Sequence, residues 1–167
     1  MGYWGYFVVG RSERPLAGLD ALSGAKGMEL RSEAPGGWQV WEYPSGDGEV
    51  GNMNVLAEET GVPALFGYVM DSDCVVVEAA APASGAWTAC LGRAAMAGYV
   101  GAGAEGLTLE DYFLDPSDAA DRAVAWAAEA GHDVAPGPLV DVLTAEADPL
   151  AENLFFRLLD RLGVVPL

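Results

Sequence analysis

The chain has 167 residues, of which 51% are hydrophobic, and a formal net charge of −17. This length suits one domain with a substantial core, and the hydrophobic fraction excludes disorder throughout. The negative charge repels phosphate backbones and anionic membrane surfaces, so we expect neither nucleic acid nor membrane as a partner. No apolar run approaches the roughly 20 residues of a membrane span. The apolar opening lacks a preceding basic segment, so we expect no secretory signal and a cytoplasmic protein.

The first third of the chain predicts two strands, a loop and a short helix. Residues 3–9 have apolar side chains on both faces, as in a covered inner strand. Residues 16–22 are compatible with a short helical turn, and residues 23–37, with four glycines and one proline, predict a loop. Residues 38–43 predict a second strand, followed by a turn at 44–48. Asn52 or Asn54 can cap a short helix over residues 55–60, which Gly61 ends.

Residues 62–91 predict three consecutive antiparallel strands, because runs with period-two alternation are separated by turns at 71–73 and 82–85. One face is expected to hold the aromatic side chains and to form the core under the helices: Phe66, Tyr68, Met70, Val75, Val77, Trp87 and Leu91. The opposite face is expected to be more polar, with Cys74, Val76, Glu78, Thr88 and Cys90.

The second half of the chain is predicted to be helical. Residues 92–100 predict a helix, 101–106 a glycine-rich connector, and 107–114 either a strand or a short helix. Asp115 and Pro116 begin a strong helix, and two more are predicted at 138–145 and 150–162. The order of strands followed by helices predicts an α+β fold: an antiparallel sheet of about five strands with helices capping one face. Residues 1–167 then form one domain, strand-rich over 1–91 and helix-rich over 92–167.

Three blocks of the sequence carry a resemblance to a known group of proteins. The first is MGYWGYFVVGRSERPL, the second is VPALFGYVMDSDCVVVEAAAP followed by GAWTACLGRAAMAGY, and the third is ENLFFRLLDRLGV. With 28 alanines, and one lysine against seven arginines, the composition is similar to that of high-GC actinobacterial proteomes. Together these features resemble a family of small, acidic, uncharacterised streptomycete proteins over nearly the whole chain. The resemblance implies no activity and assigns no functional residues.

The motifs that could carry chemistry each have a simpler interpretation. Residues 101–106 match G-x-G-x-x-G but follow a helix rather than a strand, which favours a connector over a nucleotide site. His132, the only histidine, follows a helix end, where a capping or surface role competes with that of a general base. Asp71 and Asp73 flank a turn without the alternating ligands of a calcium loop. Cys74 and Cys90 could pair or remain buried thiols, and we expect no metal site and no cofactor.

Two functions remain open. The first is a non-catalytic interaction protein, with an immunity, antitoxin-like or regulatory role, whose acidic helical half binds a basic partner protein. Its partner-binding residues would be Asp115, Asp118, Asp121, Asp141, Glu146, Asp148 and Glu152. The second is a small-molecule-binding protein or enzyme with an aromatic pocket on the sheet, formed by Trp38, Trp41, Tyr68 and Trp87. Either a monomer or a homodimer is compatible with the sequence.

Overall fold

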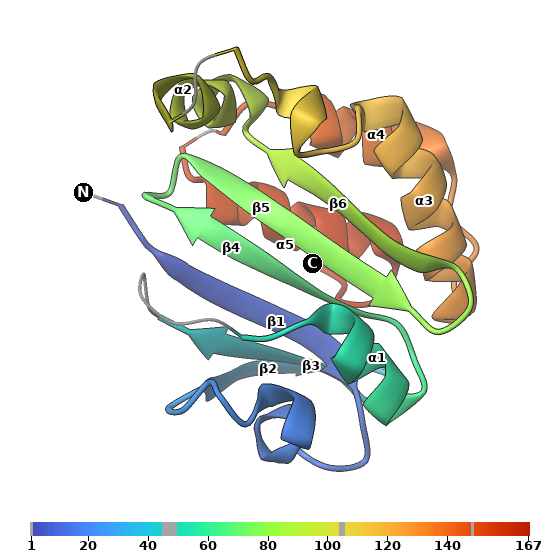
Figure 1. Ribbon diagram of the computed structural model, residues 1–167. Coiled ribbons are helices and arrows are strands. Elements are labelled where there is room, and N and C mark those ends of the chain that lie inside the picture. The colour runs from blue at the N-terminus through green and yellow to red at the C-terminus, as the bar shows by residue number, and fades with distance from the viewer. Residues whose placement is uncertain (1, 45–49, 104–105, 148) are drawn as a thin grey trace.

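The computed structural model describes residues 2–44, 50–103, 106–147 and 149–167. Its centre is a six-stranded antiparallel sheet with the order β2-β3-β1-β4-β5-β6 (Figure 1). The strands are β1 (Gly5–Arg11), β2 (Glu29–Ala34), β3 (Trp38–Tyr43), β4 (Ala64–Met70), β5 (Cys74–Ala81) and β6 (Gly85–Leu91). The predicted α+β class and antiparallel sheet are confirmed, with six strands rather than about five.

The additional strand is β2, which lies in the segment that the sequence predicts as a loop. It is one of the two edge strands of the sheet and pairs only with β3. None of its residues is fully buried. The strand therefore lacks the alternation of buried apolar and exposed polar residues by which a strand is recognised in a sequence. The loop prediction was therefore wrong for residues 29–34, where backbone pairing to β3 forms the strand.

Helices cover the two faces of the sheet unequally (Figure 1). Three helices of the C-terminal half pack on one face: α3 (Pro116–Glu129), α4 (Pro136–Thr144) and α5 (Ala151–Leu162). The other face carries α1 (Met53–Thr60) near one end and α2 (Arg93–Gly103) near the other. Among the described residues, three short 3-10 helices complete the fold: η1 (Leu16–Gly18), η2 (Asp20–Leu22) and η3 (Leu109–Asp111).

The predicted helix ends are largely confirmed. The Asn52 side chain accepts a hydrogen bond from the backbone N–H of Asn54, and Asp115 accepts one from that of Asp118. Gly61 and Gly163 end α1 and α5 with positive φ angles of 74° and 85°. The connector prediction at 101–106 was wrong in part, because residues 101–103 continue α2 and residues 104–105 lie outside the described residues.

The core under the three C-terminal helices is aliphatic on β4 and β5, not aromatic. Leu65, Val69, Val75 and Val77 point toward these helices, while Phe66, Tyr68 and Met70 lie on the opposite face. The predicted grouping of these aromatic side chains with Val75 and Val77 was therefore wrong. Met70 pairs with Cys74 across a three-residue turn, so even-numbered residues of β4 face even-numbered residues of β5.

The turn between β4 and β5 ties three parts of the fold together through Ser72. The Ser72 hydroxyl accepts a hydrogen bond from the backbone N–H of Tyr3 and donates one to Glu152, at 2.8 and 2.9 Å. Its carbonyl oxygen accepts from the N–H of Ala151 at the start of α5. Asp71 and Ser72 both have positive φ angles, and these contacts offset the conformational cost. The predicted turn is confirmed, and it anchors the N-terminus and α5.

The turn between β5 and β6 is fixed by Glu129 at the end of α3. Its carboxylate accepts hydrogen bonds from the backbone N–H groups of Ala83 and Ser84, each at 2.8 Å. Desolvation by burial is the largest single influence on the Glu129 pKa and raises it. The hydrogen bonds from Ala83 and Ser84 together outweigh it, so the pKa of Glu129 is lowered.

We expect Glu129→Gln to reduce the free energy of unfolding at pH 7 by a few tenths to about 1 kcal/mol, since water screens this site. A lowered pKa in the folded state means that the ionised form stabilises the fold above the unfolded-state pKa. This stabilisation disappears as the pH falls through the folded-state pKa. Urea denaturation at pH 7 and pH 3 should show the gap between wild type and variant shrinking in acid. Glu58→Gln, at an exposed position of α1, is the matched control, and a gap independent of pH would contradict the explanation.

Candidate functional site

The centre of the face that carries α1 and α2 has no helix over it (Figure 1). Strand register places Tyr43 opposite Tyr6, Tyr6 opposite Tyr68, and Tyr68 opposite Val76. These residues therefore form one row that crosses β3, β1, β4 and β5. The adjacent row crosses the same strands and continues to β6: Trp41, Val8, Phe66, Glu78 and Thr88.

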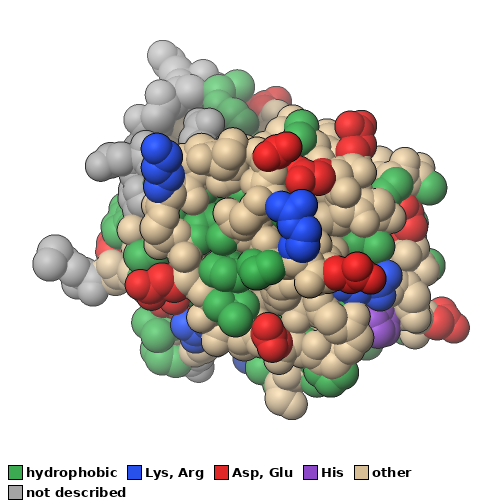
Figure 2. All heavy atoms as spheres, turned by 90° about the horizontal axis from the view of Figure 1, so that it is seen from below, with side chains coloured by type: hydrophobic (Ala, Val, Ile, Leu, Met, Phe, Trp, Pro, Cys, Tyr) green, Lys and Arg blue, Asp and Glu red, His purple; other side chains and the backbone are tan. Residues whose placement is uncertain are grey.

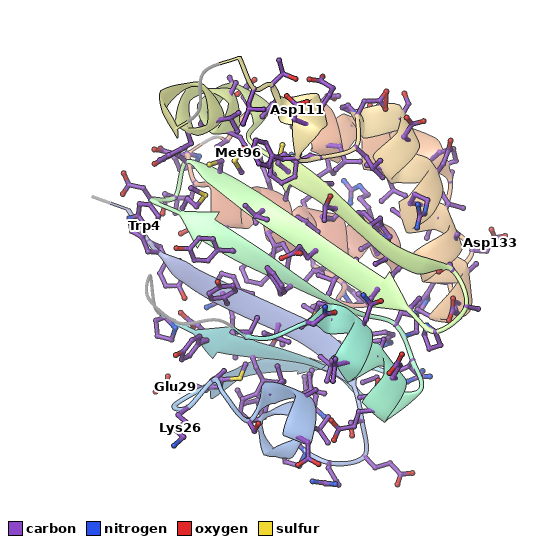
Figure 3. All side chains as sticks on the ribbon, in the orientation of Figure 1. Trp4, Lys26, Glu29, Met96, Asp111 and Asp133 are labelled. Carbon is purple, nitrogen blue, oxygen red and sulfur yellow. The ribbon has the colours of Figure 1, made fainter. Side chains whose placement is uncertain are left out.

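The tyrosine row extends into a continuous series of ring contacts. The Tyr6 ring centroid lies 4.5 Å from that of Tyr68 and 6.2 Å from that of Tyr43. Trp4, just before β1 (Figure 3), lies 6.3 Å from Tyr68 and 6.5 Å from Tyr99 of α2. These separations match the tilted and edge-to-face geometries that aromatic pairs prefer. We call this run of five rings the aromatic ladder: Tyr99, Trp4, Tyr68, Tyr6 and Tyr43.

The aromatic ladder is accessible to solvent. Trp4 is 41% exposed, and the four tyrosines are half-buried. The chain's other tryptophans, except the half-buried Trp41, have at most 4% exposure. Scattered apolar residues are normal on any protein surface. A connected set of partly exposed aromatic rings is a stronger indication of a binding site.

Carboxylates flank the aromatic ladder. Glu78 is exposed on β5, opposite Phe66 and Thr88. It lines a partly open hollow of about 160 Å³ with Tyr6, Val50, Gly51 and Phe66. A neighbouring hollow of about 320 Å³ also includes Glu78 and reaches the start of α1.

At the α2 end of the aromatic ladder, the local potential is negative. The pKa of Tyr99 is raised, first by desolvation and then by the nearby Asp73, Cys74 and Asp71. The Asp71 carboxylate also accepts a hydrogen bond from the backbone N–H of Gly2 at 2.6 Å. Exposed aromatic faces beside carboxylates attract cations, because the ring quadrupole and the negative charges act in the same direction.

The structure does not bring the four predicted pocket residues together. Trp38 and Trp87 are buried among the C-terminal helices, with 1% and 4% exposure. Trp41 and Tyr68 lie on the opposite face, where Trp41 donates a hydrogen bond from Nε1 to the side chain of Gln39. Only Tyr68 belongs to the aromatic ladder.

The predicted partner-binding carboxylates have different environments. Asp118 and Asp121 on α3, Asp141 on α4, and Glu146 are exposed. Asp115 caps α3, and Glu152 is half-buried against Ser72. Asp148 lies outside the described residues. On the face that Figure 2 shows, acidic side chains are interspersed with basic ones and do not form one continuous patch.

Two other features bear on the predicted sites. His132 is half-buried, and its ring lies where a side chain at Gly163 would be, which closes the contact between α3 and the end of α5. A hollow of about 670 Å³ beside η1 includes Arg11 and Arg14 together with two glutamates. One of them, Glu59, accepts hydrogen bonds from the backbone N–H groups of Asp20 and Ala21, so this carboxylate already has hydrogen-bond partners within the protein.

Sequence reasoning missed most of the aromatic ladder. Alternation along residues 3–9 puts Trp4 and Tyr6 on the same face, but it does not show that they lie beside Tyr43 or Tyr99. That proximity follows from the order of strands, in which β1 inserts between β3 and β4. Alternation along one strand gives a residue's face, whereas its neighbours depend on which strands pair.

Comparison with protein-family models, with curated proteins and with solved structures gave no match to this chain. Within the described ranges, no helix has both the length and the apolar character needed to cross a membrane. In the same ranges, no group of three or more His, Cys, Asp and Glu side chains is arranged to hold a metal ion.

Proposed function

We propose that this protein is a non-catalytic binding protein for a basic partner protein, whose Arg or Lys side chains lie on the aromatic ladder. The observation that carries the proposal is a run of five rings, of which Trp4 is exposed and four are half-buried, flanked by Glu78, Asp71 and Asp73 in a chain of net charge −17. An immunity, antitoxin-like or regulatory role fits such binding.

Each cation placed over a ring face contributes about 0.5–2 kcal/mol, depending on how far it is desolvated. Trp4 offers the best such surface because it combines an indole ring with 41% exposure. The tyrosine row continues this surface across three strands, so an extended basic segment could place successive side chains on successive rings.

The acidic helices have a different role in this proposal. Asp118, Asp121 and Asp141 are exposed on the far side of the sheet from the aromatic ladder. Charges that do not touch a partner act mainly on the rate of association, and salt screens them. They would steer a basic partner without holding it.

The direct test uses a fluorescently labelled hexa-arginine peptide and measures anisotropy at low salt. We expect Trp4→Leu to weaken binding roughly 2- to 30-fold, corresponding to the loss of one cation–π contact. Glu78→Gln should also weaken binding while preserving the side-chain shape.

Tyr112→Leu is the matched control, since Tyr112 is an exposed aromatic residue outside the aromatic ladder, with 50% exposure. A hexa-glutamate peptide controls for nonspecific association. Equal affinity of wild type and Trp4→Leu for hexa-arginine would overturn the location of the site.

A double variant, Asp118→Asn with Asp121→Asn, tests whether these carboxylates only speed up association with the partner or also contact it directly. We expect slower association and a weaker dependence on salt, with little change in the dissociation rate. Stopped-flow mixing with hexa-arginine at 20 and 200 mM salt would measure both (the salt range spans Debye lengths of roughly 20 to 7 Å). A change confined to the dissociation rate would instead assign these carboxylates to the binding surface.

A second function is favoured by the partly open hollow at Glu78. Its volume of about 160 Å³ and its lining by Tyr6, Phe66 and Glu78 suit a small organic cation. Calorimetric titration with tetramethylammonium distinguishes the two functions. Saturable binding of tetramethylammonium without binding of hexa-arginine would favour a small-molecule-binding protein.

A further inference from the structure

A separate hollow lies beside α2, at the end of the sheet where the aromatic ladder reaches Tyr99. It has a volume of about 320 Å³ and is open to solvent. Every residue that lines it is apolar or aromatic: Met70, Val76, Met96, Tyr99, Val100, Tyr112 and Phe113. We call it the α2 hollow. Single apolar residues are normal on a protein surface, whereas a concave group of them indicates a contact site.

The sheet and α2 both contribute to the α2 hollow. Met70 ends β4 opposite Cys74, and Val76 lies two positions beyond Cys74 on the same face of β5. Met96 and Val100 are four positions apart on α2, so their side chains lie on the same side of the helix. These side chains pack into one apolar cluster.

Hydrogen bonds fix the segment that completes the lining. Thr88 of β6 donates from Oγ1 to the carbonyl oxygen of Tyr112 at 3.1 Å, and its own carbonyl oxygen accepts from the N–H of Leu114 at 3.2 Å. Just before this segment, the Asp111 carboxylate accepts from the backbone N–H of Thr108 at 2.7 Å and caps η3. The α2 hollow is therefore preformed, and an occupant would bind without the cost of ordering this segment.

The surroundings of this apolar hollow carry negative charge. Asp73 lines the adjacent hollow of about 360 Å³ at α2, and Asp111 lies in η3 (Figure 3). Glu110 pairs with Arg93 at 3.6 Å, so these two charges offset each other. Among the described residues, neither Asp73 nor Asp111 forms an ion pair. Two uncompensated carboxylates thus lie near the α2 hollow.

This combination of an apolar hollow and nearby carboxylates selects one kind of occupant. A second copy of the chain also has a net charge of −17 and is repelled, and a fatty acid would bring its own carboxylate toward these carboxylates. An apolar side chain next to Arg or Lys matches both features. Buried anchor residues with a polar rim are typical of protein interfaces, and flexible Met side chains adapt to the shape of an anchor.

We propose that the α2 hollow binds one large apolar side chain of the basic partner, at the end of the segment that lies on the aromatic ladder. This inference rests on the proposed function and specifies the partner's sequence: a residue such as leucine beside a run of Arg or Lys. Tyr99 lines the α2 hollow and is also the first ring of the aromatic ladder, with Trp4 6.5 Å away. The apolar anchor and the first cation would therefore contact adjacent surfaces.

The test compares labelled peptides by fluorescence anisotropy. Two peptides carry one leucine at the N-terminal or the C-terminal end of six arginines, and their controls carry serine instead. Full burial of such a side chain corresponds to roughly 10- to 150-fold in affinity. Because the α2 hollow is open to solvent, we expect one leucine peptide to bind about 10-fold more tightly than its serine control.

Methionine methyl groups report the location of the anchor. In protein labelled with ¹³C-methyl methionine, the leucine peptide should shift the signals of Met70 and Met96, and the serine peptide should not. Met28 and Met53, which pack on the α1 side of the sheet, serve as internal controls. Shifts of Met70 and Met96 that depend on protein concentration without any peptide would assign the α2 hollow to a second copy and overturn the proposal.

A nearly isosteric variant tests the apolar contact. Val76→Thr keeps a β-branched side chain on the strand but places a hydroxyl group in the α2 hollow, so it should reduce the gain from leucine at least 3-fold. Hexa-arginine affinity should stay the same. Val55→Thr, at a 50% exposed position of α1, is the matched control and should leave the gain unchanged.

The peptides also separate failure of this inference from failure of the proposed function. Binding of hexa-arginine without a gain from leucine would reject the anchor and leave the proposed function intact. Binding of a leucine peptide with shifts of Met70 and Met96, but with no loss in Trp4→Leu, would reject the aromatic ladder as the cation site and keep the anchor. Binding of none of these peptides would overturn both.

Discussion

Trp126→Ala should lower the free energy of unfolding by about 3–5 kcal/mol, the range typical of removing a large aromatic side chain from a core. Trp126 is fully buried on α3 and packs beside Trp38, with ring centroids 6.0 Å apart. Its Nε1 donates to the carbonyl oxygens of Ala64 and Ala80, at 3.2 and 3.1 Å, and so joins the helix to β4 and β5. Denaturation by guanidinium, followed by far-ultraviolet circular dichroism, measures the loss.

Phenylalanine substitutions separate the contribution of the Trp126 hydrogen bonds to stability from the contribution of its side-chain volume. Trp126→Phe removes the shared donor, and we expect it to cost about 1–3 kcal/mol more than Trp87→Phe. Trp87 is a matched control, because it is 4% exposed and its Nε1 has no hydrogen-bond partner among the described residues. Equal losses in the two variants would show that the hydrogen bonds of Trp126 contribute nothing net.

The second large effect concerns Gly67 on β4. A Cβ atom there would lie 2.5 Å from two ring atoms of Phe155 on α5. This distance is shorter than two non-bonded carbon atoms can approach each other. Phe155 is fully buried, so its ring has little free space into which it could move. Gly67→Ala should therefore destabilise the protein by about 1–3 kcal/mol.

A double-mutant cycle tests the cause. Phe155→Leu leaves room for the new methyl group, so the double variant should be more stable than the sum of the single effects predicts, by about 1 kcal/mol or more. Gly98→Ala is a contrasting control, because Gly98 lies in α2 with no atom within 4 Å of the added methyl group. That change should stabilise by about 0.5–1 kcal/mol. Additive effects of Gly67→Ala and Phe155→Leu would reject the steric explanation.

The elements with strong local signals were the predictable ones. Asp115 followed by Pro116 predicts the start of α3, and glycines with positive φ end α1 and α5 as expected. These signals work because a helix end has unsatisfied backbone groups that only a few residue types can satisfy. Strand β2 has no comparable signal, because its only requirement is to pair with β3 at the edge of the sheet.

The candidate site was only partly predictable for the same reason. Tyr68 was named as a pocket residue, but the other ladder residues were not, and Trp38 and Trp87 lie in the opposite core. The rings of Trp4 and Tyr99 are 95 positions apart in the chain (99 minus 4), yet their centroids lie 6.5 Å from each other. No periodicity within one segment contains that information.

The amino-acid sequence by itself determined the α+β class, the principal helix ends, the turn at Ser72 and the acidic character of the chain. Each depends on residues that are neighbours in the sequence, or on composition alone. Only the tertiary structure decided which face of the sheet the helices cover and which rings form the aromatic ladder. It also decided that Cys74, Cys90 and Met96 pack together beneath α2. These features depend on strand order and register, where a shift of one residue moves every side chain of a strand to the other face.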